Sequence, residues 1–135
     1  MNSTPVVHVY TICWNEERVL PYFLRHYSRF ARRIIVYDNY STDTSPQIVR
    51  SSAVTELRYF GLPTNCGGES ERVAVRQSAW QESRESADWV IVVDCDEFLW
   101  HPVLLEYLST CHARGITVPR PTGYEMFANE FPDTN

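Results

Sequence analysis

The chain of 135 residues has the length of a single domain and can bury enough surface to form a hydrophobic core. Hydrophobic residues make up 44% of it, a proportion that excludes an intrinsically disordered protein. The formal net charge of −5 argues against a nucleic-acid backbone as the main partner.

We find no sign of a membrane span or a signal peptide in the sequence. No window reaches the ~18 apolar residues of a transmembrane helix, and Met1–Pro5 has neither a basic start nor an apolar core. We therefore expect a cytoplasmic protein with no transmembrane segment. None of the cysteines has the Cys-x-x-Cys spacing of a zinc knuckle. Cys13 and Cys95 are expected to be small buried residues at strand ends.

Strands and helices are expected to alternate along the first half of the chain. Val6–Cys13 is β-branched and mostly apolar, which is typical of a strand, and Asn15 after it is a favourable N-cap for a helix. That helix has Pro21 in its first turn, where proline is tolerated. A second strand over Ile34–Tyr37 is followed by turn residues and by Pro46, at the expected start of a short helix.

The second half continues this alternation and predicts the fold class. The remaining expected elements are a strand over Thr55–Phe60, a loop over Gly61–Ser70, a helix over Glu71–Ser86, a strand over Trp89–Val93, a helix from Pro102 to a stop at Gly115, and a strand over Ile116–Val118. The order predicts one α/β domain over residues 1–135, Rossmann-like, with a mostly parallel sheet and helices on both faces.

Acidic residues directly follow the apolar strand over Trp89–Val93, at Asp94, Asp96 and Glu97. A buried strand does not tolerate unpaired charge, so the chain must leave the core at Asp94. Ligands of open α/β sheets bind at this end of the strands, and Asp94 and Asp96 point the same way if the strand geometry continues. Two close carboxylates favour a bound cation, which predicts Mg²⁺ or Mn²⁺. The alternative is a polar loop whose acids cap the following helix.

Three motifs resemble, in their order and separation, the markers of family 2 glycosyltransferases. They are a strand ending in Asn-Glu at Ile12–Glu17, an Asp-x-x-Ser-Thr-Asp turn within Tyr37–Asp43, and an Asp-x-Asp motif at Asp94–Asp96. The segment Trp80–Trp89 is similar to a bacterial branch of the same family. The resemblance covers nearly the whole chain, and it implies the glycosyltransferase A fold with a site for a nucleotide-diphosphate sugar.

The resemblance also implies which residues contact the nucleoside. Thr11, Cys13 and Asn15 would border the base and ribose, and Asp38 would accept a hydrogen bond from the base, most often uracil. Asn15 and Asp38 each have a structural alternative, because asparagine can begin a helix and aspartate can cap a turn.

The remaining implied contacts concern the diphosphate and the metal. Arg76 would reach the base or the diphosphate, or else be an ordinary surface arginine. Asp94 would lie near the ribose and the metal, and Asp96 would be the principal ligand of Mn²⁺ or Mg²⁺. The implied activity is an inverting transfer of a sugar, most often from a UDP-sugar, to an acceptor hydroxyl. The sequence does not indicate the acceptor.

The family places its catalytic base and acceptor-binding elements after the Asp-x-Asp strand, and this chain stops soon afterwards. The resemblance therefore implies a truncated, donor-binding part whose catalytic residues are unknown. Glu125 and Glu130 are candidates for the base only because they are acidic and come late in the chain. One alternative is a non-catalytic fragment that binds nucleotide-sugar. Another is a haloacid-dehalogenase-type phosphatase, whose Asp-x-Asp motif normally ends the first strand, whereas here it ends the fourth expected one.

Overall fold

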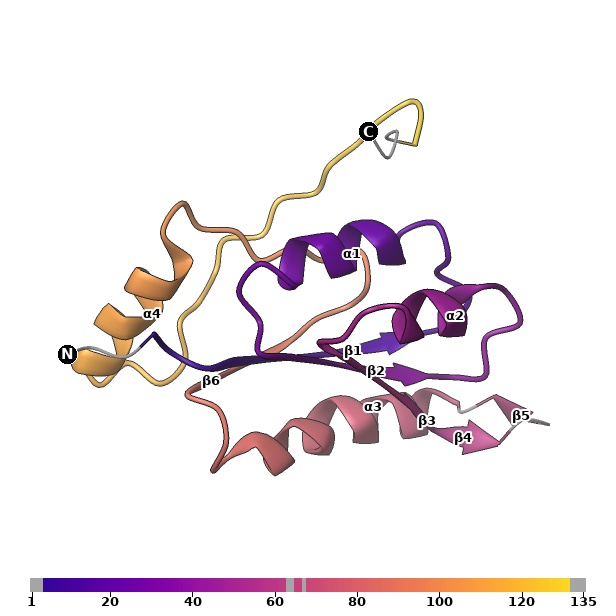
Figure 1. Cartoon of the computed structure of the whole chain (residues 1–135), viewed down its shortest axis with the longest axis horizontal. Helices are drawn as coiled ribbons and strands as arrows, with labels where there is room; N and C mark the ends of the chain where they lie inside the picture. The colour runs from indigo at the N-terminus through magenta and orange to yellow at the C-terminus, as the bar shows by residue number, and fades with distance from the viewer. Residues whose placement is uncertain (1–3, 63–64, 67, 132–135) are drawn as a thin grey trace.

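A parallel sheet forms the centre of the protein in the computed structural model, which describes residues 4–62, 65–66 and 68–131. The sheet has the strand order β3-β2-β1-β6 (Figure 1). All pairs of neighbouring strands run parallel. The predicted α/β, Rossmann-like fold is therefore confirmed. The bounds are β1 at Val7–Cys13, β2 at Arg33–Asp38, β3 at Thr55–Tyr59 and β6 at Trp89–Val92.

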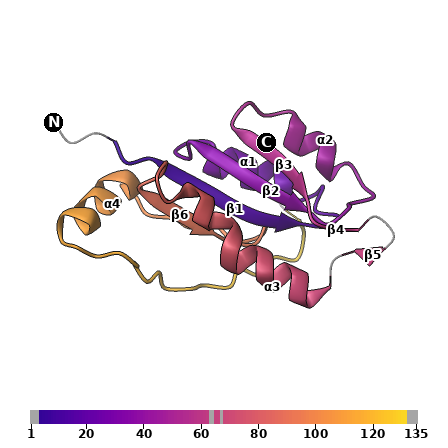
Figure 2. The ribbon, with the colours of Figure 1, turned by 90° about the horizontal axis from the view of Figure 1, so that it is seen from below.

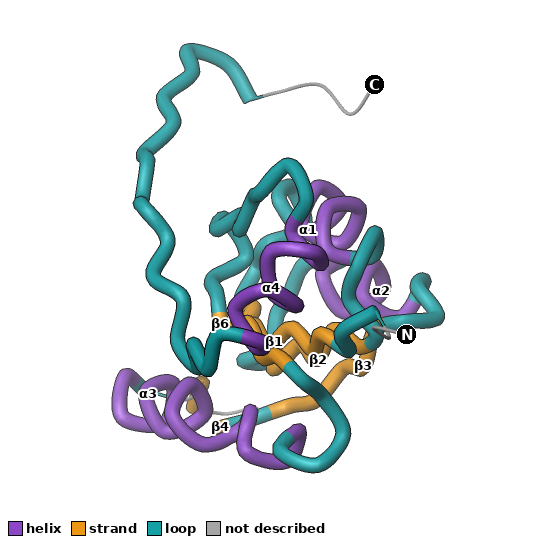
Figure 3. Tube along the Cα trace, turned by 90° about the vertical axis from the view of Figure 1, so that its left-hand side faces the viewer, coloured by secondary structure: helices purple, strands orange, loops and turns teal. Residues whose placement is uncertain are grey.

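Helices cover both faces of the sheet, as predicted. Figures 1 and 2 show α1 (Leu20–Tyr27) and α2 (Ser45–Arg50) on one face and α3 (Glu69–Ser78) on the other. The chain continues from α3 into a 3₁₀ helix, η1, at Ala79–Ser83. Figure 3 shows α4 (Leu104–Ala113) on the same side as α1.

The core lies between β1 and α1. The residues of β1 are almost all buried, because a strand in the middle of a parallel sheet is covered on both faces. Leu20, Phe23 and Tyr27 of α1 are completely buried and pack in the same cluster as Val7 and Val9 of β1. Each such side chain contributes roughly 1.5–3 kcal/mol by burial. Pro21 lies in the first turn of α1, as expected.

Two expectations about single elements are wrong. The helix expected over Glu71–Ser86 begins at Glu69 and gives way to η1 at Ala79. The expected strand over Ile116–Val118 is absent from the described part of the chain. Gly115, with φ of 70°, ends α4, and Val118 is 75% exposed with no strand beside it. Apolar β-branched residues form a strand only where a neighbouring strand can pair with them.

The segment expected to be a loop over Gly61–Ser70 holds two short paired strands. They are β4 at Gly61–Leu62 and β5 at Asn65–Cys66, which pair antiparallel. The helix α3 also begins within it, at Glu69. Across the residues that the structure describes, every helix is too short or too polar to pass through a membrane.

Candidate functional site

The ends of three parallel strands bring the sequence motifs together at one edge of the sheet. We call this region the carboxyl edge and define it by Trp14–Glu17 after β1, Asp38–Thr44 at the end of β2, and Asp94–Glu97 after β6. β1 is hydrogen-bonded to both β2 and β6, so the three segments must emerge side by side. The fold therefore places all three motifs where open α/β sheets bind their ligands.

Asn15 joins two loops of the carboxyl edge and does not cap α1. Its side-chain oxygen accepts hydrogen bonds from the backbone N–H groups of Thr42 at 2.7 Å and Asp43 at 3.3 Å. Its own N–H donates to the Ser41 hydroxyl at 2.8 Å. The N-cap of α1 is Val19, so the expectation of an Asn15 cap is wrong. Asn15 has φ of 55°, a conformation that asparagine adopts more readily than most residues.

Asp38 is completely buried at the end of β2. Its two carboxylate oxygens accept hydrogen bonds from the backbone N–H of Ser41 at 2.8 Å and from the Ser41 hydroxyl at 2.5 Å. These contacts are those of a turn cap, which was the structural alternative for this residue. In this arrangement, the Asp38 carboxylate holds the turn and is covered from any ligand.

Thr11 and Cys13 lie beneath the carboxyl edge, in the core. Thr11 is 3% exposed, and Cys13 is fully buried beside Cys95. The nearby Cys13 thiol, together with burial, raises the pKa of the Cys95 thiol, which therefore stays protonated. Both cysteines are buried, as predicted, and neither they nor Thr11 reach the surface of the edge.

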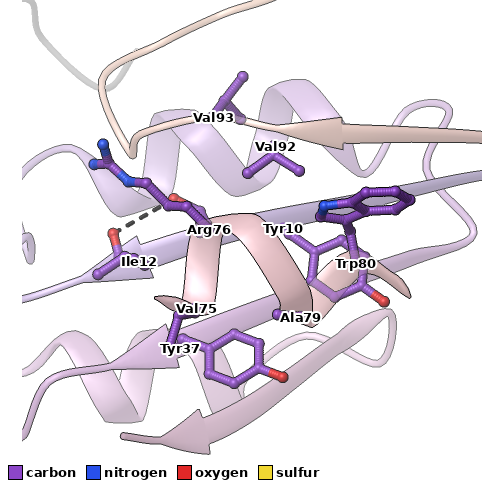
Figure 4. A pocket seen from close by; sticks show the side chains of 10 residues that line it. Tyr10, Ile12, Tyr37, Val75, Arg76, Ala79, Trp80, Val92 and Val93 are labelled. Atoms are coloured by element: carbon purple, nitrogen blue, oxygen red, sulfur yellow. Dashed lines mark hydrogen bonds between the residues drawn. The ribbon is translucent and has the colours of Figure 1, made fainter. Parts of the chain in front are cut away.

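Arg76 reaches the carboxyl edge from α3, where it pairs with Asp94. Both side chains are about two-fifths exposed, at 41% and 42%. Figure 4 shows Arg76 extending along the sheet away from Trp80. The space between α3 and the sheet measures about 10 Å³, which leaves room for roughly one water molecule. A ligand of Arg76 therefore lies at the edge, outside this space.

The chain leaves the extended conformation after β6, so Asp94 and Asp96 do not follow the alternation of a strand. The Glu97 N–H donates to the Asp94 carbonyl at 3.0 Å, which closes a turn. The Glu97 carboxylate accepts from the Asp94 N–H at 2.9 Å and so caps that turn. Asp94 turns toward α3 and Arg76, whereas Asp96 lines a cavity beside α1.

This second cavity, the α1 cavity, measures about 410 Å³ and lies on the opposite side of the carboxyl edge from α3. Its volume is within the range of small-molecule sites. Tyr27 holds the segment around Phe98, which lines the cavity: the Tyr27 hydroxyl donates to the Glu97 carbonyl at 3.0 Å and accepts from the Leu99 N–H at 2.9 Å. Burial raises the pKa of Tyr27 to about 12. The cavity is lined by Val19, Tyr22, Arg25, His26, Arg29, Asp96, Phe98, Met126 and Phe131.

Negative charge gathers at the carboxyl edge. Burial raises the pKa of Glu16, and the carboxylates of Asp96, Asp43 and Asp94 raise it further. Within the described ranges, no three His, Cys, Asp or Glu side chains converge as a metal site. The edge thus supplies separate carboxylates and one arginine, and not a complete set of protein ligands for a metal ion.

Trp14 is a candidate site residue to which the sequence motifs assign no role. It follows β1 directly and is 54% exposed at the carboxyl edge, where an aromatic ring can stack on a planar ligand. The signal was a large aromatic residue between a buried strand and a polar turn, a place where core packing does not require one.

No family model and no curated protein matches the chain. The interpretation of the carboxyl edge therefore depends on its own residues. Its surface includes an aromatic ring, a guanidinium and two carboxylates that could contact a charged, planar ligand, at Trp14, Arg76, Asp94 and Asp96.

Proposed function

We propose that the chain is the donor-binding part of a family 2-like glycosyltransferase, which binds a nucleotide-diphosphate sugar at the carboxyl edge with Mn²⁺ or Mg²⁺. The observation that carries the proposal is the pairing of Arg76 with Asp94 at the end of a parallel strand, next to Asp96. This edge is the usual ligand position of open α/β sheets. The three motifs that resemble the family meet there.

The donor atoms at the edge fit a hard divalent cation. Mg²⁺ and Mn²⁺ are held by one or two protein carboxylates together with phosphate oxygens and water. Asp94, on the side of α3, and Asp96, on the side of the α1 cavity, each supply one such carboxylate, and neither is buried. Burial is the main cause of the raised pKa of Glu16, and the carboxylates of Asp96, Asp43 and Asp94 add to it, which shows acidic groups near one another where a cation would reduce their repulsion. When bound, the cation would neutralise charge on the departing diphosphate.

The remaining exposed groups suit a nucleoside diphosphate. Arg76 is positioned to exchange its contact with Asp94 for the diphosphate oxygens, which guanidinium groups bind in pairs. The half-exposed ring of Trp14 offers a stacking surface for a base. Asp38 and Asn15 support this site by fixing the loops beneath it.

In the proposed reaction, an acceptor hydroxyl oxygen forms a bond to the anomeric carbon of the donor sugar. The bond from that carbon to the diphosphate oxygen breaks, and its electron pair leaves with the nucleoside diphosphate. The hydroxyl proton passes to a base, and attack from the opposite side inverts the anomeric configuration. The two candidates for this base that the sequence offers, Glu125 and Glu130, are both exposed in the tail after α4.

Calorimetric titration of UDP and of GDP, with and without Mn²⁺, tests the proposal. We expect UDP to bind only with Mn²⁺ and Asp96→Ala to weaken binding by ~100-fold, the usual order for loss of a charged ligand contact. The control is Glu85→Ala, which removes an exposed acid away from the edge. Equal affinity in Asp96→Ala would contradict the site.

Turnover assays separate the alternatives. Release of sugar from a UDP-sugar panel with Mn²⁺ favours the transferase, whereas metal-dependent binding without turnover favours a non-catalytic donor-binding fragment. Phosphate release from a simple monoester would support the phosphatase instead.

A further inference from the structure

The α1 cavity has the composition of a site for an acidic, ring-shaped ligand. Two arginines line it, Arg25 from the last turn of α1 and Arg29 from the turn that follows the helix. Arg29 forms no ion pair with any carboxylate in the described residues, and the Arg25 guanidinium lies over the Tyr22 ring at 5.2 Å. Among the described residues, Arg29 therefore presents a guanidinium at the cavity that an acidic group of a ligand can pair with.

Aromatic rings form the other walls of the α1 cavity. Phe131, from the tail after α4, packs edge-on against Tyr22 with ring centroids 5.7 Å apart. The Arg18 guanidinium lies over Phe131 at 4.5 Å and holds it there. Phe98 contributes a 43% exposed ring from the segment after Asp96. Ring faces of this kind pack against the C–H faces of a sugar, while arginines bind its acidic group.

The position of the α1 cavity relates it to sugar transfer. Asp96 lines the cavity, and Asp96 is also the carboxylate proposed to hold the metal of the donor. A transfer reaction requires the acceptor hydroxyl next to the donor sugar, so a ligand in this cavity lies beside the reacting bond.

We infer that the α1 cavity forms part of the acceptor site, between α1 and residues that follow the Asp-x-Asp motif, and that the acceptor is a saccharide carrying a carboxylate or phosphate group. Its acidic group pairs with Arg29, and its ring lies against Tyr22 and Phe98. The role as acceptor rests on the proposed function, whereas binding of an acidic saccharide does not require donor or metal.

The test is calorimetric titration of the chain, without nucleotide or metal, by glucuronate, glucose 6-phosphate, glucose and inorganic phosphate. We expect one or both acidic sugars to bind at least ~10-fold more tightly than glucose, the order expected for one charge-assisted contact. We also expect the better acidic sugar to bind more tightly than inorganic phosphate, because the rings contact the sugar. Comparison of glucuronate with glucose 6-phosphate identifies the acidic group.

Arg29→Gln is expected to reduce acidic-sugar binding to the level of glucose. The matched control is Arg32→Gln, which removes the same charge from an exposed position outside the cavity. Circular dichroism verifies that both variants fold. Equal binding of glucose and the acidic sugars, inorganic phosphate binding as tightly as either, or an unchanged Arg29→Gln variant would each overturn the inference. The titration with UDP and Mn²⁺ tests the donor site separately from the titration with acidic sugars. Failure of the proposed function can therefore be told apart from failure of this inference.

Discussion

At the scale of single residues, Asp38 decides between structure and ligand recognition. Asp38→Ala removes a fully buried carboxylate and leaves the partly buried N–H and hydroxyl of Ser41 without their partner. We expect a loss of about 2 kcal/mol in the free energy of unfolding, since an orphaned buried polar group costs about 1–3 kcal/mol. Urea denaturation of the variant and the wild type measures this loss in the free energy of unfolding.

Glu85→Ala is the control for Asp38, because an exposed acid changes stability by less than ~0.5 kcal/mol. The contrary result is an Asp38→Ala protein of normal stability that no longer binds UDP. That result would make Asp38 a base contact, as the resemblance to the glycosyltransferases implies, and would require the turn to open on binding.

His8 gives the protein a stability that depends on pH. It is 2% exposed, its Nδ1 lies 2.7 Å from the Ser83 hydroxyl, and burial, with Arg33 nearby, lowers its pKa below the ordinary 6.5. Below pH 6.5 the unfolded chain takes up a proton that the folded chain resists. Folded stability contributed by His8 is therefore complete above this pH and falls as the pH drops toward the lowered pKa.

His8→Gln provides the measurement, because glutamine keeps a polar group near Ser83 and cannot take up the proton. We expect unfolding free energies from urea titrations to fall less steeply between pH 6.5 and 5 in this variant than in the wild type. Parallel curves for the two proteins would mean that His8 is protonated in the folded state as readily as in the unfolded one.

At the scale of elements, α3 contacts the sheet through partly buried side chains and one ion pair, whereas α1 packs against it with fully buried apolar residues. No residue of α3 is buried, whereas Leu20, Phe23, Leu24 and Tyr27 of α1 are. The 3₁₀ helix after α3 is fixed by Glu82, which accepts hydrogen bonds from Arg58 at 2.8 Å and Tyr10 at 3.0 Å. Exposed ion pairs contribute less than ~1 kcal/mol each, so α3 is the less stable helix.

We expect the amides of α3 to exchange with deuterium faster than those of α1, because elements with little buried apolar surface open at low cost. Hydrogen–deuterium exchange followed by mass spectrometry measures this. UDP with Mn²⁺ should slow exchange around Arg76 if the diphosphate contacts it. Equal protection of the two helices would show that the charged network holds α3 as firmly as a core.

The elements differ in how far local sequence predicts them. β1 and β6 are β-branched apolar runs bounded by polar residues, and such a signal lies within the strand itself. Ile116–Val118 has the same kind of residues and forms no strand, because pairing depends on a neighbour that the sequence does not specify. Asn15 resembled a helix cap, and its true partner is Thr42, which the fold brings close.

At the scale of the whole molecule, the sheet divides the carboxyl edge into two sides. The order of the motifs predicted that the edge would collect them, because parallel strands end together. It did not predict that the turn at Asp94–Glu97 sends Asp94 toward Arg76 and Asp96 toward the α1 cavity. That division depends on the local hydrogen bonds of Glu97 and Tyr27, which the spacing of residues in the sequence does not predict.

The bridge made by Asn15 has a consequence for ligand recognition. Because its side chain ties the loop after β1 to the loop after β2, both loops are already ordered in the free protein. If a nucleotide binds there as proposed, its binding would cost the chain little additional conformational entropy. Differences in affinity among related nucleotides should therefore be enthalpic in origin and reflect their direct contacts, since every nucleotide meets the same preorganised surface.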